Sequence, residues 1–368
     1  MEKTYQLNWD LYPKAAELVG YPSTDYFCIH IVTLGTKIWA ENNRNSRYVD
    51  ISKKRPLEYS LDKINWTRYS EGTKLSTLNC VYFRTALPAA GYESVGEVAD
   101  TSYWRFAFDG PVYISGKIST LLCKDYTRND IKVPCPEPSN ISWSTGWESR
   151  NPNGFGCLFD PNAYPINNSY YVPSYFVYET KYLDLNVDIN DCPYAFAMSF
   201  ACTNIKKLPI MPRMNSSSNL SAGCFREMFY NCERLEETPA LPAINLGKTA
   251  YYDMFHYCRK LKQLPKLQAL TLNFGAYASM FIGCENIKVS KIQTNEYQYE
   301  FRIPDSGTAT VIQPDQPSDW NTTTYPTEEM LAGTGGTFTR EQIPLPGTTE
   351  HYGLLVDTVY YTDTPLKY

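Results

Sequence analysis

The chain has 368 residues, of which 15% are aromatic and only 20% are charged, with 31 Tyr and 25 Pro. This mixture favours strands and turns over long amphipathic helices, and the length indicates two or three modules. The formal net charge is −5 and no Lys/Arg-rich run occurs, which excludes the electrostatic footprint of a nucleic-acid binder. The sequence also has no run of about 18 apolar residues and no apolar leader, so we expect neither a membrane span nor secretion.

Residues 1–56 match no pattern that we can assign, and we expect them to be an N-terminal adaptor or anchor that can be removed without unfolding the rest. Residues 57–122 alternate between apolar and polar side chains, which predicts a β-sandwich-like module. It begins with a hairpin over 57–72 that turns at Asp62-Lys63. Residues 123–190 are aromatic and rich in Pro and Asn, which indicates a loop-rich insert.

Residues 191–290 contain an internal repeat, and a β-rich C-terminal segment, 291–368, follows it. Four segments align from Met198, Met228, Met254 and Met280: MSFACTNIKKLP, MFYNCERLEETP, MFHYCRKLKQLP and MFIGCENIKVS. Spacings of this size are typical of stacked supersecondary units. The predicted core of the repeats consists of Met198, Cys202, Ile205, Met228, Phe229, Cys232, Leu235, Met254, Phe255, Cys258, Leu261, Met280, Phe281, Cys284 and Ile287.

Each repeat is expected to hold one short helix and one short strand. Tyr251, Met254, Phe255 and Cys258 recur at i, i+3, i+4 and i+7, which predicts one face of a helix. The LKQLP segment that follows predicts a strand ending at a proline. The predicted fold is therefore mainly β with a short α/β solenoid. The four repeat cysteines, including Cys202, are expected to be buried, reduced and aligned.

The repeat of Met-Phe, a spaced Cys, Leu and Pro resembles the BspA-type leucine-rich repeats. Such repeats occur on bacterial surface proteins and in tail or fibre proteins of gut bacteriophages, the crAss-like group included. The flanking segments YSLDKINW, SGKISTLL, EYQYEFRIPDSGT and EEMLAGTGGTFT are similar to the frame around these repeats in the phage proteins. The resemblance covers roughly residues 57–339 and implies a leucine-rich-repeat solenoid in a virion protein.

The inventory of catalytic and metal-binding residues is thin. Only His30, His256 and His351 occur, and His256 lies within a repeat. No nucleophile motif, Cys-x-x-Cys pair or His-x-x-x-His pair is present. We therefore expect no catalytic residues, no cofactor and no metal. The binding candidates are aromatic residues at the insert: Trp143, Trp147, Tyr170, Tyr171 and Tyr175. The alternative is that these rings pack a small module of their own or a subunit interface.

The sequence thus predicts a non-enzymatic structural virion protein, a head fibre or tail appendage made in the host bacterial cytoplasm. Its expected partners are other virion proteins (capsid, portal or tail), a host surface glycan or protein, and further copies of itself, a trimer being the first expectation. Two alternatives stay open. One is a bacterial cell-surface adhesin with the same repeats, and the other is a fibre-borne glycan depolymerase with paired carboxylates.

Overall fold

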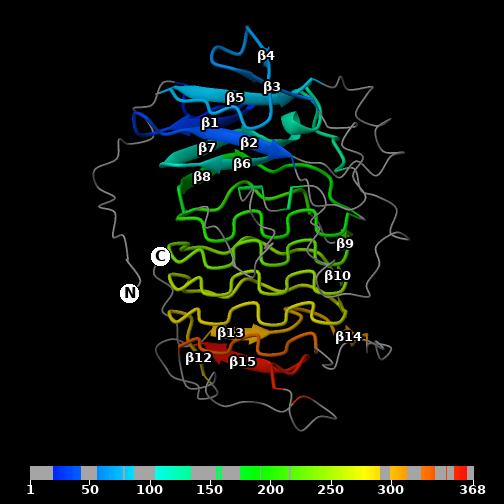
Figure 1. Cartoon of the computed structure of the whole chain (residues 1–368). Helices are drawn as coiled ribbons and strands as arrows, with labels where there is room; N and C mark the ends of the chain where they lie inside the picture. Colours follow the sequence, from blue (N-terminus) through cyan, green and yellow to red (C-terminus); the bar gives the residue numbers. More distant parts are fainter. Residues whose placement is uncertain are drawn as a thin grey trace.

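The computed structural model describes residues 20–42, 56–77, 79–86, 104–133, 155–156, 158–159, 175–190, 192–214, 217–290, 299–312, 325–335, 345 and 352–362. Within these ranges the protein is mainly β, as predicted from composition, and its one helix is a short 3-10 turn (Figure 1). The elements are β1 Phe27–Ile31, β2 Ile38–Asn42, β3 Leu57–Ser60, β4 Thr67–Arg68, β5 Cys80–Thr85, β6 Trp104–Phe108, β7 Val112–Lys117, η5 Ile118–Leu121, β8 Val177–Asp184, β9 Asn219–Leu220, β10 Asn245–Leu246, β11 Thr271–Leu272, β12 Val289–Ser290, β13 Tyr299–Arg302, β14 Thr310–Val311 and β15 Val359–Thr362.

A six-stranded sheet at one end of the molecule has the order β4-β3-β5-β1-β7-β8. The hairpin predicted over 57–72 is present as the antiparallel pair β3–β4. Its turn is held by Asp62, whose carboxylate accepts the backbone N–H groups of Ile64 and Asn65. The turn predicted at Asp62-Lys63 is thus confirmed, although the loop that contains it is longer than two residues.

Strand β1 lies in the interior of this sheet, although it comes from the segment expected to be a separable adaptor. It pairs antiparallel with β5 on one side and with β7 on the other. All five of its residues are buried. Residues 27–31 therefore belong to the sheet, so residues 1–56 are not a separate adaptor segment. The sequence alone did not show this, because strand pairing across long separations is not visible in local pattern.

A two-stranded sheet, β2–β6, packs on one face of the larger sheet. The ring of Phe106 in β6 lies 5.0 Å from the ring of Phe27 in β1 and 5.0 Å from that of Phe83 in β5. The apolar residues of β1 that face this contact alternate with Cys28 and His30, which must therefore lie on the opposite face of the sheet. This alternation places the candidate site described below.

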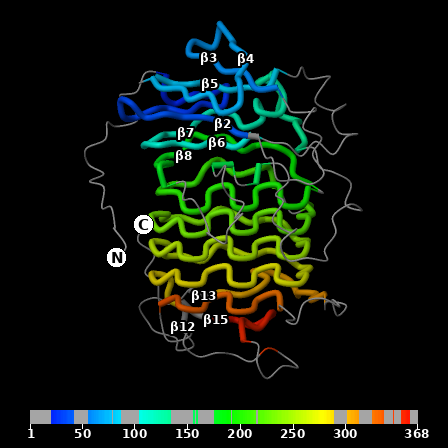
Figure 2. Tube along the Cα trace, viewed as in Figure 1, coloured from blue at the N-terminus to red at the C-terminus, as the bar shows by residue number. Residues whose placement is uncertain are grey.

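Repeat segments are stacked beneath the sheets, one above the next (Figure 2). On one side, the two-residue strands β9, β10 and β11 of the repeat segments and β14 of the C-terminal segment form a parallel ladder in the order β14-β11-β10-β9. Successive strands start at Asn219, Asn245 and Thr271, so the repeat length is 26 residues here. The strand predicted at LKQLP is not among the named strands; the strands of the ladder instead precede the Met-Phe segments that start at Met228, Met254 and Met280.

The opposite side consists of turn segments, by which we mean residues 194–203, 223–232, 249–258, 275–284 and 327–334. The sequence predicted helices here, and that prediction is wrong: these residues form consecutive β-turns. Every fourth residue has a positive φ, as in Thr249, Asp253 and Tyr257, with values of 52°, 54° and 60°. Backbone N–H groups alternate between two acceptors. Met254 donates to Tyr251 within its own turn, whereas Phe255 donates to Met280 in the next segment.

The helices were predicted wrongly because the period of a helix, 3.6 residues, is close to the four-residue period of these turns. Apolar residues at i, i+3, i+4 and i+7 fit a helix with 3.6 residues per turn, but they fit a four-residue repeat of turns equally well over eight residues. The hydrogen bonds between neighbouring segments decide the matter, because a helix would use the same N–H groups internally. Sequence periodicity cannot distinguish the two solutions at this length.

Two columns of aromatic rings run through the interior of the stack. One contains Phe155, Phe196, Phe225, Tyr251 and Tyr277, with 5.5 to 6.2 Å between the centroids of neighbouring rings. The other contains Phe159, Phe200, Phe229, Phe255 and Phe281, with 5.4 to 5.6 Å between neighbours. Phe155 and Phe159 come from the expected insert, so at least this part of it lies within the stack.

The columns correct the alignment of the first repeat by one residue. Phe200 stacks on Phe229, so Ser199 and Thr203 occupy the positions of Met228 and Cys232. Met198 and Cys202 instead take positive-φ positions, with φ of 57° and 59°, and are only half-buried. The other thirteen residues of the predicted core are buried. Alignment of the sequences matched the Met and Cys residues of the repeats. In the structure it is Phe200 that aligns with Phe229.

The repeat cysteine has a definite structural role. The Cys232 thiol donates to the backbone carbonyl of Phe200 in the preceding segment at 3.0 Å. Cys258 and Cys284 repeat this contact with Phe229 and Phe255, each at 3.1 Å. A buried carbonyl thereby gains a second donor, which an aliphatic side chain could not supply.

Thiol reactivity should separate Cys202 from its three apparent equivalents. All four are reduced, but burial raises the pKa of Cys232 to about 12 and raises those of Cys258 and Cys284 further above the ordinary value. Because the thiolate is the nucleophile, we expect Cys202 to be alkylated first and the other three only on unfolding. Time-resolved iodoacetamide labelling with peptide mass spectrometry measures this order. Equal rates at all four sites would contradict the register described above.

The far end of the stack is closed by residues beyond 290. Backbone N–H groups of Phe281 and Gly283 donate to Met330 and Ala332, so residues 327–334 form a further turn segment. Phe301 and Ile303, from the EYQYEFRIP stretch, are buried there. Both side chains belong to the same hydrophobic core as Phe281 of the last repeat. A single hydrophobic core includes residues from β1 to Tyr360, so sheets and stack are continuous.

Candidate functional site

Most of the predicted aromatic binding residues lie outside the described part of the chain. Trp143, Trp147, Tyr170 and Tyr171 fall there. Tyr175 is described: it immediately precedes β8, is 41% exposed, and its ring centroid lies 4.4 Å from that of Phe176. The structure therefore does not bring the five residues together as a site, and it shows one of them at the surface.

An aromatic group that the sequence did not single out lies on the outer surface of the turn segments. It consists of Tyr230, His256 and Tyr257, called here the tyrosine patch. Their ring centroids lie 5.0 Å apart for Tyr230 and His256 and 4.3 Å for His256 and Tyr257. Tyr257 is 37% exposed and lies on Gly283, where an added Cβ would come within 2.4 Å of its ring. The missing side chain at residue 283 thus makes room for the patch.

Charged groups from neighbouring segments border the patch. The Arg259 guanidinium lies 5.8 Å from the Tyr257 ring centroid and pairs with Glu233 at 3.6 Å and Glu285 at 3.5 Å. Inside the patch, Asp253 lies 2.6 Å from His256 Nδ1. Burial raises the pKa of Asp253, while the hydrogen bond to His256 opposes the shift. Rings flanked by guanidinium and carboxylate groups can stack against sugars or protein side chains and orient them by hydrogen bonds.

A second cluster lies within the six-stranded sheet and contains Cys28, His30 and Cys80. These residues come from adjacent strands: His30 is directly opposite Cys80 in the β1–β5 pairing, and Cys28 is opposite Tyr82. All three side chains are buried, and their ligand atoms lie within 4.8 Å of one another. Two thiols and an imidazole thus converge on one point of a strongly paired part of the sheet.

Hydrogen bonds hold this cluster in one arrangement. Cys80 Sγ lies 2.9 Å from His30 Nδ1, and His30 Nε2 lies 2.7 Å from the Ser115 hydroxyl on β7. The backbone N–H of Ser23 donates to the same hydroxyl at 2.9 Å. The ring of Tyr21 meets the edge of the His30 ring with a centroid separation of 4.6 Å. The segment 20–23 therefore covers the cluster.

The electrostatic environment differentiates the two thiols. A hydrogen bond from Cys28, aided by His30, holds the pKa of Cys80 well below its usual range in spite of burial. Burial keeps the pKa of Cys28 well above the ordinary value. Within the pair, Cys80 is therefore the more acidic thiol.

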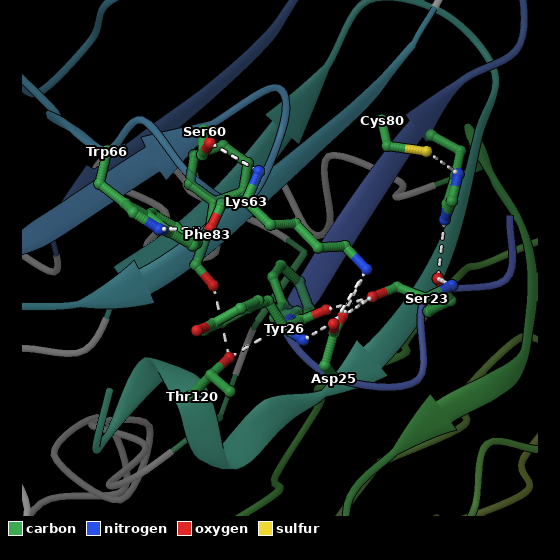
Figure 3. A network of polar contacts seen from close by, with 12 residues as sticks. Ser23, Asp25, Tyr26, Ser60, Lys63, Trp66, Cys80, Phe83 and Thr120 are labelled. Carbon is green, nitrogen blue, oxygen red and sulfur yellow. Dashed lines mark hydrogen bonds and ion pairs between the residues drawn. The ribbon is translucent and has the colours of Figure 1, made fainter. Parts of the chain in front are cut away.

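An ion pair lies beside the cluster (Figure 3). Lys63, from the β3–β4 loop, lies 2.8 Å from Asp25 and 4.7 Å above the ring of Tyr82. Asp25 also accepts the Ser23 hydroxyl and the backbone N–H of Tyr26. Burial acts to raise the pKa of Asp25, but the hydrogen bonds from Lys63, Ser23 and the Tyr26 N–H together outweigh it, and the pKa is lowered. These contacts fix the covering segment against the hairpin loop.

Part of this cluster could have been predicted from the sequence, by a spacing that differs from the metal-binding motifs considered above. Cys28-Ile29-His30 has the i, i+2 spacing that places two side chains on one face of a strand. The spacings Cys-x-x-Cys and His-x-x-x-His do not describe metal ligands on a strand, where alternate residues share one face. Cys80 could not be associated with them by sequence, because it lies 50 residues away from His30.

Comparison with known protein families, curated proteins and solved structures gives no match. Among the described residues, no helix has both the length and the apolar character needed to cross a membrane. Cys192 is disulfide-bonded, unlike the eight described cysteines that are reduced.

Proposed function

We propose that this chain is a non-enzymatic structural and recognition protein of a bacteriophage particle, a head fibre or a tail appendage. The observation that carries the proposal is the in-register stack of repeats that shares one core with the terminal sheets. Such a body is rigid along its length and presents the same side-chain positions repeatedly on its surface. That is what an appendage that holds a binding surface away from a particle requires.

The finer architecture is part of this proposal. The N-terminal sheets form a sandwich-like module, the stack is a solenoid related to the BspA-type leucine-rich repeats, and the β-rich C-terminal segment closes it. The resemblance of the Met-Phe and Cys positions supports this relation. The turn segments depart from a helical leucine-rich repeat, yet they keep the feature that defines a solenoid, since each unit is hydrogen-bonded to its neighbours.

The tyrosine patch is the proposed recognition surface. It joins side chains of two successive turn segments, and Arg259 connects it by ion pairs to the segments on either side. The partners are a host surface glycan or protein, and further virion proteins at the attachment end. Tyrosine and arginine are enriched among the residues that contribute most to binding at protein interfaces.

Purified particles of the phage that encodes the chain provide the test. Mass spectrometry of the particles should detect the protein at a constant copy number, and antibody labelling should place it on an appendage. Absence from particles, with secretion to a bacterial surface instead, would favour the adhesin alternative.

Binding is tested separately with immobilised host glycans and surface proteins. We expect Tyr230→Ala to reduce binding by about tenfold or more, since truncating an aromatic anchor commonly costs more than 1 kcal/mol. Lys262→Ala, an exposed change in the neighbouring repeat that carries Tyr257, is the matched control and should bind as the wild type does. Shortening of the glycan chains during incubation would contradict the non-enzymatic proposal and support a depolymerase.

A further inference from the structure

We propose that Cys28, His30 and Cys80 form a binding site for a zinc ion that connects β1 to β5. The site is independent of the recognition function proposed above. Its ligand class follows from the donor set, because thiolates combined with imidazole select zinc over the hard cations that prefer oxygen.

The distances suit a tetrahedral ion. With Zn–S near 2.3 Å and Zn–N near 2.0–2.1 Å, ligand atoms in a tetrahedral site lie about 3.6 to 3.8 Å apart. All three donor atoms lie within 4.8 Å of one another. The Cys80–His30 contact is 2.9 Å, so binding would lengthen it by about 0.7 Å, which a side-chain rotation accommodates. Because the three ligands come from paired strands, the backbone need not move.

The surroundings supply the support that metal-ligating histidines normally have. A ligating imidazole usually passes its other ring N–H to an acceptor, which sets the tautomer and the ring orientation. In this sheet His30 Nε2 lies 2.7 Å from the Ser115 hydroxyl, which can accept such an N–H, and Nδ1 is directed at Cys80 Sγ. Ser115 is fully buried and is itself fixed by the N–H of Ser23. An acceptor for the Nε2–H of a metal-bound imidazole is therefore already in place.

A disulfide is a poorer explanation for the two cysteines. Cys28 is opposite Tyr82 rather than Cys80, so the two cysteines are diagonal neighbours in the ladder. Diagonal residues in an antiparallel pair have Cα atoms about 7–8 Å apart. A disulfide requires about 4.4–6.8 Å. A bridging ion spans the diagonal without distorting the sheet, and both cysteines are reduced in the structure.

The cover over the cluster is shaped closely around it. A Cβ on Gly20 would come within 2.5 Å of the Tyr82 hydroxyl and 2.9 Å of Cys80 Sγ, so only glycine fits there. The Tyr82 hydroxyl is hydrogen-bonded to Cys80, which brings a phenol oxygen within reach as a fourth donor. Segment 20–23 closes the site from solvent, as structural zinc sites generally are closed.

The test uses the full-length protein, purified without a metal-binding tag, stripped with a chelator and then supplied with Zn²⁺ or Co²⁺. Elemental mass spectrometry should find about one zinc per chain. The cobalt form should show thiolate-to-cobalt charge-transfer absorption and the strong visible bands of a tetrahedral ion. Wild-type protein that retains no zinc, or a cobalt spectrum without thiolate bands, overturns the proposal.

Variants locate the site. Cys28→Ser and Cys80→Ser should lose stoichiometric zinc, whereas Cys202→Ser, which removes a thiol far from the cluster in sequence, should retain it. Ser115→Ala keeps all three ligands and should weaken zinc binding about 10- to 100-fold, the usual effect of losing the partner of a metal-bound histidine. This variant remains informative if the cysteine variants fail to fold. Equal zinc binding in Cys28→Ser, Cys80→Ser and wild type would overturn the assignment.

Discussion

Removal of residues 1–56 is expected to abolish the folded state of the six-stranded sheet. The truncation deletes β1, which lies between β5 and β7, and it also deletes β2 of the smaller sheet. The three apolar side chains of β1 that enter the core, Phe27, Ile29 and Ile31, are fully buried. Burial of each such side chain contributes about 1.5–3 kcal/mol, so their combined loss is comparable with the whole stability of a typical domain.

Circular dichroism and size-exclusion chromatography of the truncated protein measure this effect. We expect aggregation, or loss of cooperative unfolding, because β5 and β7 would each expose an unpaired edge. A truncation of residues 1–19 removes none of the described strands and is the matched control. A soluble, cooperatively unfolding protein without residues 1–56 would contradict the placement of β1. Particle incorporation should therefore be tested with the shorter truncation.

Phe255→Ala is expected to lower the free energy of unfolding by about 3–5 kcal/mol, the range for truncating a fully buried phenylalanine. Its ring lies between those of Phe229 and Phe281, at 5.6 and 5.4 Å. The backbone of residue 255 is hydrogen-bonded to the next segment and cannot easily collapse into the cavity. Both ring contacts are lost together, and stacked aromatic pairs each contribute about 0.5–1.5 kcal/mol beyond their buried area.

Urea denaturation followed by circular dichroism measures the change. Lys262→Ala, in the same repeat but exposed, should alter stability by less than about 0.5 kcal/mol. A loss below about 1 kcal/mol for Phe255→Ala would show that the rings do not form a continuous column. Because each segment contacts chiefly its neighbours, we expect the effect to be largest at the centre of the stack and smaller near its ends.

The sequence determined those features that depend on local pattern. Composition indicated a mainly β chain, the alternation over Leu57–Gly72 indicated the hairpin, and the spacing of Met-Phe and Cys indicated a repeat. These features were readable because each follows from residues close together in the chain. The strictly repeated residues also identified most of the buried positions, including Phe229, Phe255 and Phe281.

Tertiary structure alone decided three things. It replaced the predicted helices with four-residue turns, because hydrogen bonds between segments satisfy the backbone better than a helix of one or two turns could. It placed β1 between β5 and β7, whose residues paired with β1 lie 50 or more positions later in the chain. It brought Cys28 and His30 against Cys80, an encounter that only strand pairing produces. In each case the deciding contacts join residues distant in sequence, and no local period or motif encodes them.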